Sequence, residues 1–234
     1  MRWWKLSITH FDRLDSLRLR RRPVYEPAET AILKRELKAG QTFIDIGAHI
    51  GYYTLLASSL VGETGVVFAF EPSPENFGVL KNNIRAAGSN NIFPVDQAVS
   101  GKTGSTLLYL NPKNTGDNRL FNPGVQEWQK IQVQTTRLDD FFSAYSGRID
   151  FIKCDAQGHE LSIIRGAAET LSRFPKVKML VEFFPLGIKQ NGDDPETLLA
   201  ELKGLGFRTE YPAREVIARC LPENGKHCNL FLTR

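Results

Sequence analysis

The stretch from residue 45 to residue 51 combines a carboxylate with two glycines. Asp45 stands two residues before Gly47, and Gly51 follows four residues after that glycine. Glycine lets the backbone approach a ligand closely and adopt dihedral angles that other residues avoid. The start of the helix that follows supplies free N–H groups and a partial positive charge, which suit an anion. This turn, including Ala48, is therefore predicted to line a ligand site.

Three ligand classes use a turn of this kind: dinucleotides, nucleoside triphosphates and S-adenosylmethionine. No Gly-Lys-Ser/Thr follows, which excludes a Walker phosphate loop. The dinucleotide fingerprint needs a third glycine at a position that His49 occupies. A pyrophosphate would be repelled by Asp45, whereas the ammonium group of a methionine moiety would be attracted to it. The turn therefore favours S-adenosylmethionine.

A second carboxylate, Glu71, ends a predicted strand twenty residues after Gly51. Nucleoside-binding α/β folds place a carboxylate there to accept hydrogen bonds from ribose hydroxyls. The neighbouring Pro72 and Ser73 are predicted to belong to the same cofactor site. Asp96 and Gln97 follow the next strand and could hold the adenine amino group, although capping a loop is an equally good account of both residues.

Acid–base chemistry is predicted at the ends of two later strands. Methylation of a hydroxyl needs a group that removes its proton, and Asp155 and Glu182 are the candidates for the base or the substrate orienter. Lys153 lies two residues before Asp155 and hence on the same strand face. Burial is expected to raise the pKa of Asp155. His49 and His159 are alternative bases. No metal site is expected, because no paired-histidine spacing supports one on Asp155, His159 and Glu182.

The elements that position these residues alternate between strand and helix. Strands are predicted at 41–44, 66–70, 92–95, 149–154, 177–181, 207–211 and 229–233, and helices at 27–37, 52–61, 75–87, 160–171 and 197–203. The unbroken apolar runs are typical of parallel strands covered on both faces. Two further strands, 105–110 and 131–136, flank a polar loop that is too long for a tight hairpin and is of the kind that often contacts ligands.

At residues 153–160 the sequence, Lys-Cys-Asp-Ala-Gln-Gly-His-Glu, resembles the motif Lys-x-Asp-x-Glu-Gly-x-Glu of the FkbM family of methyltransferases. The resemblance covers roughly residues 25–234. Its other motifs are at 45–51, 70–77, 82–84, 138–141 and 181–182. The chain departs from the motif at Gln157, where the family carries Glu, and this puts the usual activity or substrate in doubt.

The resemblance implies a Rossmann-like α/β fold of class I methyltransferases. It implies a seven-stranded, mostly parallel sheet in the order 3-2-1-4-5-7-6, with the last strand antiparallel and helices on both faces. It also implies S-adenosylmethionine as cofactor and O-methylation of a hydroxyl on a sugar, a natural product or a similar small molecule. Two alternatives stay open: an RNA methyltransferase, and a module that binds S-adenosylmethionine with weak or no catalysis.

Composition places the chain among ordinary globular proteins, with 41% hydrophobic and 24% charged residues. The net charge of +4 is concentrated in a predicted basic extension, residues 1–24, followed by a single domain, 25–234. This extension could touch an anionic membrane surface, whereas the nearly neutral remainder makes a nucleic-acid partner a poor fit. No apolar run reaches the ~20 residues of a membrane helix. Three cysteines without metal-binding spacing favour reduced thiols and a cytoplasmic location.

Overall fold

The computed structural model describes residues 24–221 and 226–234. The predicted basic extension therefore lies outside the described residues, apart from Val24, and so does its expected contact with a membrane. In the described part of the chain, no helix combines the length and the apolar character that crossing a bilayer requires.

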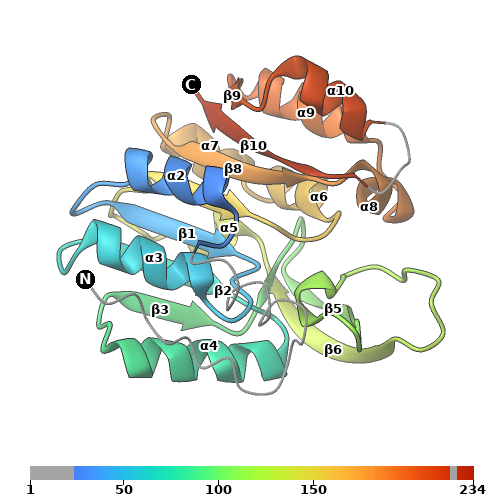
Figure 1. Cartoon of the computed structure of the whole chain (residues 1–234), viewed down its shortest axis with the longest axis horizontal. Helices are drawn as coiled ribbons and strands as arrows, with labels where there is room; N and C mark the ends of the chain where they lie inside the picture. Colours follow the sequence, from blue (N-terminus) through green and yellow to red (C-terminus); the bar gives the residue numbers. More distant parts are fainter. Residues whose placement is uncertain (1–23, 222–225) are drawn as a thin grey trace.

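Seven strands form one twisted sheet in the order β3-β2-β1-β7-β8-β10-β9 (Figure 1). The strands are β1 Thr42–Ile46, β2 Val66–Phe70, β3 Ile92–Val95, β7 Phe151–Cys154, β8 Lys178–Phe183, β9 Arg208–Tyr211 and β10 Cys228–Thr233. The first five positions in the sheet are joined by parallel pairs, and β10 runs antiparallel to both β8 and β9. Renumbered within this sheet, the order is 3-2-1-4-5-7-6, so the predicted fold is confirmed.

Central strand β1 shows why the sheet is covered on both faces. All five of its residues are buried, and successive side chains of a strand point to opposite faces. Phe43 packs in one apolar core with residues of helices α2 and α3. Its neighbour Ile44 packs in the other core with residues of α5, α6 and α7. Two layers of helices are therefore needed, one on each face of the sheet.

The helices are short and have recognisable ends. Their bounds are α2 Pro27–Glu36, α3 Tyr52–Val61, α4 Pro74–Ala87, α5 Leu138–Phe141, α6 Glu160–Arg165, α7 Ala168–Arg173, α8 Pro185–Gln190, α9 Pro195–Gly204 and α10 Arg214–Cys220. In α4, the Ser73 hydroxyl accepts a hydrogen bond from the Asn76 N–H (3.5 Å), Pro74 occupies the first turn, and Gly88 ends the helix in the left-handed conformation.

The single helix predicted over 160–171 is in fact two helices, α6 and α7. Gly166 separates them, and a side chain at this position would collide with the carbonyl oxygen of Ser100. The Gly166 carbonyl also accepts a hydrogen bond from the Asp139 N–H at 3.1 Å. Packing against the Ser100 loop and against α5 therefore interrupts a helix that the sequence pattern presents as continuous.

A second, three-stranded sheet stands beside the carboxyl ends of the main strands. It consists of β4 Ala98–Val99, β5 Gly104–Leu110 and β6 Gln129–Thr136, in the order β4-β6-β5. β5 and β6 pair antiparallel, and the long connection between them contains a short 3₁₀ helix, η1 Thr115–Asp117. Figure 1 shows this sheet and its connection projecting from the body of the domain. The two predicted strands and their long polar loop are thus confirmed.

Candidate active site

A cavity of about 280 Å³ opens at the carboxyl ends of β1, β2, β7 and β8. This is the edge of an open α/β sheet at which ligands bind. Six of the nine residues predicted for the cofactor line the cavity: Asp45, Gly47, Ala48, Glu71, Pro72 and Gln97. The three predicted catalytic residues also line it: Lys153, Asp155 and Glu182. Residues as far apart in the chain as Asp45 and Glu182 are therefore brought into one site.

The other three predicted cofactor residues lie outside the lining. Gly51 caps α3 in the left-handed conformation, with φ 95°. Ser73 is buried and caps α4, and Asp96 is exposed at the end of β3. In the described structure, Gly51 and Ser73 therefore act as caps of α3 and α4, the two helices that flank the cavity.

The glycine turn joins the ends of β1 and β7. Gly47 adopts φ 77°, and a Cβ at this position would overlap the carbonyl oxygen of Asp155, so only glycine permits the approach. The N–H groups of Gly47 and Ala48 both donate to the Phe70 carbonyl at 3.0 Å. These two N–H groups are therefore not free for a pyrophosphate, whereas the free N–H groups expected from the sequence belong to the start of α3, which comes later, at Tyr52.

Asp45 carries an unsatisfied oxygen. Its Oδ2 accepts a hydrogen bond from the Thr54 hydroxyl at 2.6 Å, whereas its buried Oδ1 has no hydrogen-bond partner in the described part of the chain. Burial raises the pKa of this carboxyl, and the Lys153 ammonium opposes the rise. A buried acceptor without a donor fits a ligand that brings an N–H group, such as the ammonium of a methionine moiety.

Glu71 is held by nitrogen donors rather than by a cation. Its carboxylate accepts hydrogen bonds from the N–H groups of His49 (2.8 Å) and Ser73 (3.0 Å) and from the Asn76 amide (3.4 Å). Burial raises the pKa of Glu71 to about 7, against the effect of these three bonds. The side chain is thus fixed at the cavity wall, where a hydroxyl of a ligand could donate to its oxygens.

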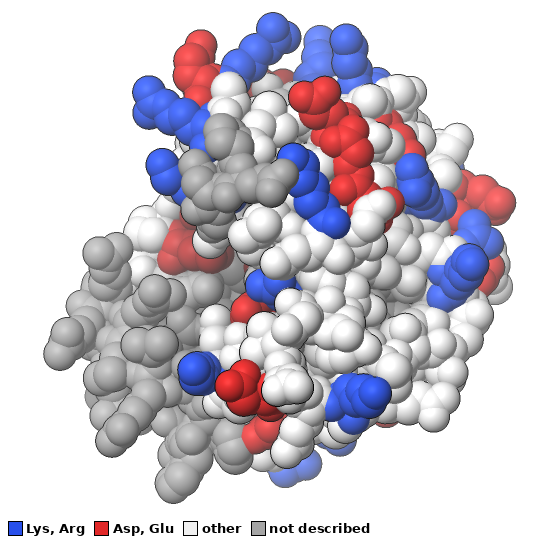
Figure 2. Space-filling model, turned by 90° about the vertical axis from the view of Figure 1, so that its right-hand side faces the viewer, with Lys and Arg blue, Asp and Glu red and all other residues white. Residues whose placement is uncertain are grey.

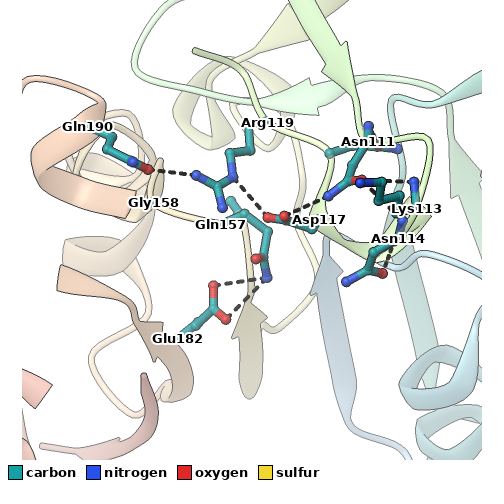
Figure 3. A network of polar contacts seen from close by, with 12 residues as sticks. Asn111, Lys113, Asn114, Asp117, Arg119, Gln157, Gly158, Glu182 and Gln190 are labelled. Atoms are coloured by element: carbon teal, nitrogen blue, oxygen red, sulfur yellow. Dashed lines mark hydrogen bonds and ion pairs between the residues drawn. The ribbon is translucent and has the colours of Figure 1, made fainter. Parts of the chain in front are cut away.

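At the other end of the cavity, Gln157 bridges two carboxylates. Its Nε2 donates to Asp155 Oδ1 at 2.8 Å and to both oxygens of Glu182 at 3.1 Å. Lys153 Nζ lies 2.9 Å from Asp155 Oδ2. Figure 3 shows the Gln157–Glu182 contact. The amide thereby links and orients the two acids that the sequence marks as catalytic candidates.

The two acids differ in proton affinity. Burial by itself would raise the pKa of Asp155, but the Lys153 ammonium and its hydrogen bond hold that pKa below the usual value. The expected net rise in the pKa of Asp155 is therefore wrong, because the Lys153 ammonium outweighs the effect of burial. Burial and the neighbouring Asp155 charge instead raise the pKa of Glu182 well above its ordinary value. The pair is thus poised to hold one proton, with Glu182 as its carrier.

Residues 114–120, in the connection between β5 and β6, form one wall of the cavity. Hydrogen bonding attaches this connection to α8. Arg119 donates through Nε to Asp117 Oδ1 (2.8 Å) and through Nη1 to Gln190 Oε1 (2.7 Å) (Figure 3). Its guanidinium carbon lies 5.4 Å from the centre of the Phe184 ring. The polar loop predicted to contact ligands therefore does line the cavity.

Neither histidine considered as a base stands free beside the catalytic pair. His159 bonds Ser100 Oγ (2.9 Å) and the Asn191 amide (3.2 Å), and burial lowers its pKa to about 4. His49 lines the cavity at the Glu71 end, where its Nε2 lies 2.9 Å from Thr115 Oγ1. The described residues contain no group of three His, Cys, Asp or Glu that could hold a metal ion.

Sequence reasoning missed Glu26, which lines the cavity from the start of α2. Within the described residues, the non-glycine residues with positive φ are Glu26 (40°), His49 (52°) and Gln157 (53°), and all three line this cavity. Such conformations are costly and concentrate at functional sites. A strained backbone leaves no mark in the sequence, so this signal could come only from the structure.

The chain is similar in sequence to known methyltransferases. The sequence model of the methyltransferase FkbM domain matches residues 45–209. The hexuronic acid methyltransferase AglP of Haloferax volcanii is 26% identical over 145 residues, which cover 60% of this chain and 55% of that protein. The methyltransferase sdnD of Sordaria araneosa is 23% identical, over 65% of this chain and 70% of its own. The chain thus spans about half of the first relative's length.

Solved structures share the fold. An FkbM methyltransferase from Methylobacillus flagellatus superimposes with a TM-score of 0.51 and 18% identity, over 82% of this chain and 43% of its own. A putative rRNA methylase from Clostridium thermocellum gives a TM-score of 0.55 at 12% identity, over 88% and 95% of the two chains. At such identities the likeness concerns the architecture alone.

Proposed function

The chain belongs to the FkbM family of S-adenosylmethionine-dependent methyltransferases, and from this membership we propose that it methylates a hydroxyl oxygen of a sugar or a similar small molecule. The observation that carries the proposal is that one cavity has two unlike ends. One end offers Asp45 and Glu71, and the other offers the pair of acids bridged by Gln157.

The first end suits the cofactor. The unsatisfied Oδ1 of Asp45 would accept from the ammonium group of the methionine moiety, and Glu71 would accept from ribose hydroxyls. Gln97 and Pro72 line the same part of the cavity and would contact the nucleoside. The bound cofactor supplies an electrophilic methyl group on a positively charged sulfur.

The second end suits the acceptor. In the proposed reaction, Asp155 orients the acceptor hydroxyl, and the pair of Asp155 and Glu182 takes up its proton. The acceptor oxygen would bond to the methyl carbon as the bond between that carbon and the sulfur breaks, with S-adenosylhomocysteine as the leaving group. Lys153 keeps Asp155 ionised, and Gln157 holds both carboxylates in place through hydrogen bonds from its amide. Alignment of the oxygen with the methyl group would supply much of the rate.

Two observations favour a sugar-like acceptor over RNA. A relative that matches 60% of this chain is named for methylation of a hexuronic acid. On the face shown in Figure 2, basic and acidic side chains of the described residues are interspersed rather than gathered into a basic stripe.

The three described cysteines are free thiols, which supports a cytoplasmic site of action.

A transfer assay tests the proposal. The purified protein is incubated with cofactor labelled in the methyl group and with a panel of free sugars, hexosides, hexuronides and RNA. We expect label in at least one sugar hydroxyl and none in RNA. Tight cofactor binding without transfer to any acceptor would instead support a binding module, and label in RNA alone would support an RNA methyltransferase, with salt-sensitive RNA binding as the second sign.

A further inference from the structure

Glu26 stands at the start of α2 with its carboxylate on the cavity wall. Tyr53 Oη donates to its Oε2 at 2.5 Å. That tyrosine ring lies under the Lys153 ammonium, whose nitrogen is 4.8 Å from the ring centre, and Lys153 Nζ bonds Asp155. Glu26 is therefore linked through two side chains to the residues proposed to act on the acceptor.

The cavity is strongly acidic. Among its described lining residues, the carboxylates Glu26, Asp45, Glu71, Asp155 and Glu182 accompany one ammonium group, that of Lys153. Carboxylates crowded in this way repel one another, and burial adds to the cost of keeping them charged. A cationic ligand in the cavity would relieve both effects.

The five carboxylates do not share their donors equally. Asp155 bonds an ammonium, Glu71 bonds three nitrogens, and Glu182 bonds the Gln157 amide. The donor recorded for Glu26 among the described residues is the neutral hydroxyl of Tyr53, on one of its two oxygens. Asp45 likewise has one neutral hydroxyl donor, that of Thr54, but its free oxygen is assigned above to the ammonium group of the methionine moiety. Glu26 is hence the carboxylate left to interact with a second positive charge in the cavity.

A second observation points to a ligand independently of the acidic cluster. Asp45 Oδ1 is buried in the cavity wall without a hydrogen-bond partner in the described chain. Asp45 itself is only 1% exposed, so bulk water cannot readily satisfy this oxygen. A donor that arrives with a ligand would, and a cation would do so most strongly.

We propose that Glu26 is a specificity-determining residue that makes the cavity prefer the charged cofactor, S-adenosylmethionine, over its product, S-adenosylhomocysteine. The two molecules share the adenosine and amino-acid groups and differ in the sulfonium charge and its methyl group. A carboxylate in the cavity without a directly bonded cation attracts the sulfonium and has no comparable interaction with a neutral thioether. Product release would thereby be favoured after each transfer. This inference rests on the cofactor use in the proposed function and not on the identity of the acceptor.

The test measures binding without any acceptor. Calorimetry gives the dissociation constants of S-adenosylmethionine, S-adenosylhomocysteine and sinefungin, an analogue with a protonated amine near the position of the methylated sulfur. Glu26→Gln keeps the shape and removes the charge. Glu26→Gly removes the side chain and suits φ 40°, so its backbone is not strained. The matched control is Glu29→Gln on the same helix, a residue outside the cavity lining.

In both Glu26 variants we expect the preference for S-adenosylmethionine over S-adenosylhomocysteine to fall by about tenfold, the effect of one nearby charge in a partly buried site. The affinity for sinefungin should fall in parallel with that for S-adenosylmethionine. The Glu29→Gln control should bind all three ligands like the wild type. Equal weakening of all three ligands, or none, would overturn the inference. A wild type that binds none of them would overturn the cofactor use itself. An altered preference in a protein that methylates no sugar would leave the inference standing and reject the acceptor.

Discussion

The two ends of the cavity hold carboxylates by opposite means. At one end, Glu71 is fixed by three nitrogen donors, two of which are backbone N–H groups of the turns that begin α3 and α4. At the other end, Asp155 is fixed by the Lys153 ammonium and the Gln157 amide. Neutral donors leave the pKa of Glu71 raised to about 7, whereas the counter-charge holds the pKa of Asp155 low.

This difference suggests a division of labour. A carboxylate held by backbone groups has a fixed position and can exchange its donors for the hydroxyls of a ligand, which suits recognition. A carboxylate held ionised by a lysine, beside an acid of raised pKa, suits the handling of a proton. The four predictions below test whether the two ends are as separate as their geometry indicates.

The largest effect is expected at the acceptor end. Asp155→Asn keeps the size of the side chain but removes its charge, so turnover should fall by roughly 10²–10⁴, the usual contribution of a positioned acid–base group. Cofactor affinity should change little, because Asp45 and Glu71 are intact. Initial rates at saturating cofactor, with calorimetry of cofactor binding, measure both effects.

The control for this variant is Asp193→Asn. Asp193 lies outside the cavity lining, 3.7 Å from Arg165, and its variant should turn over like the wild type. Full activity of Asp155→Asn would remove Asp155 from the mechanism. A large loss of cofactor affinity in the same variant would mean that the two ends are not separate.

At the cofactor end, Glu71→Gln should weaken cofactor binding by roughly ten- to a hundredfold, because charge-assisted hydrogen bonds to ribose hydroxyls become neutral ones. Turnover at saturating cofactor should stay within about threefold of the wild type. Glu75→Gln, on the exposed first turn of α4, is the matched control. Unchanged affinity in a folded Glu71→Gln protein would refute the assignment of Glu71.

The cofactor end could be predicted from the sequence much more fully than the acceptor end. Asp45 and Glu71 belong to short motifs in which strand, turn and helix are consecutive, so local spacing places them. The strand order was implied by the family resemblance. Glu26 carries no such signal, because its place in the cavity depends on the packing of α2 against α3 and on a positive φ.

The charge balance of the site also lay beyond the sequence. Asp155 ends a buried strand, and burial alone would raise its pKa, as predicted. The opposite outcome depends on a 2.9 Å contact with Lys153, whose ammonium is enclosed by the same cavity wall. Spacing along the strand put the two residues on one face, but it did not fix the distance between their charges.

A smaller effect is expected at Gln157, the position where the family motif carries Glu. Gln157→Glu replaces an N–H donor shared by Asp155 and Glu182 with a third carboxylate. Like charges raise pKa values, so the pH at half-maximal turnover should rise by about one unit. Turnover should therefore fall on the acidic side of the pH profile and recover as the pH rises past the shifted midpoint.

A pH–rate profile of Gln157→Glu measures this change, and Gln190→Glu is the control. Gln190 bonds Arg119 on α8 and lies outside the lining, so its variant adds the same charge without adding a carboxylate to the cavity. If turnover of Gln157→Glu instead increased greatly at every pH, the reaction would need a carboxylate at position 157, and the natural chain would be a weakened enzyme.

The smallest effect concerns stability and comes from Glu71 alone. Its pKa is about 7 in the folded protein and near the ordinary value of 4.5 when unfolded. Between these values the folded state binds more protons than the unfolded state, so the free energy of unfolding falls as pH rises through this window.

In the Glu71→Gln variant, the side chain at position 71 cannot titrate. The wild type should therefore lose on the order of 1–3 kcal/mol relative to this variant between about pH 4.5 and pH 7.5, without cofactor. Glu160, whose pKa is also about 7, titrates in both proteins, so its contribution cancels when the wild type is compared with the variant. Thermal melting of both proteins across this pH range measures how the stability difference between them changes with pH. A stability difference that is the same at every pH does not bear on the prediction. Parallel curves would mean that Glu71 is ionised throughout, as firmly as Asp155, and the contrast between the two ends of the cavity would disappear.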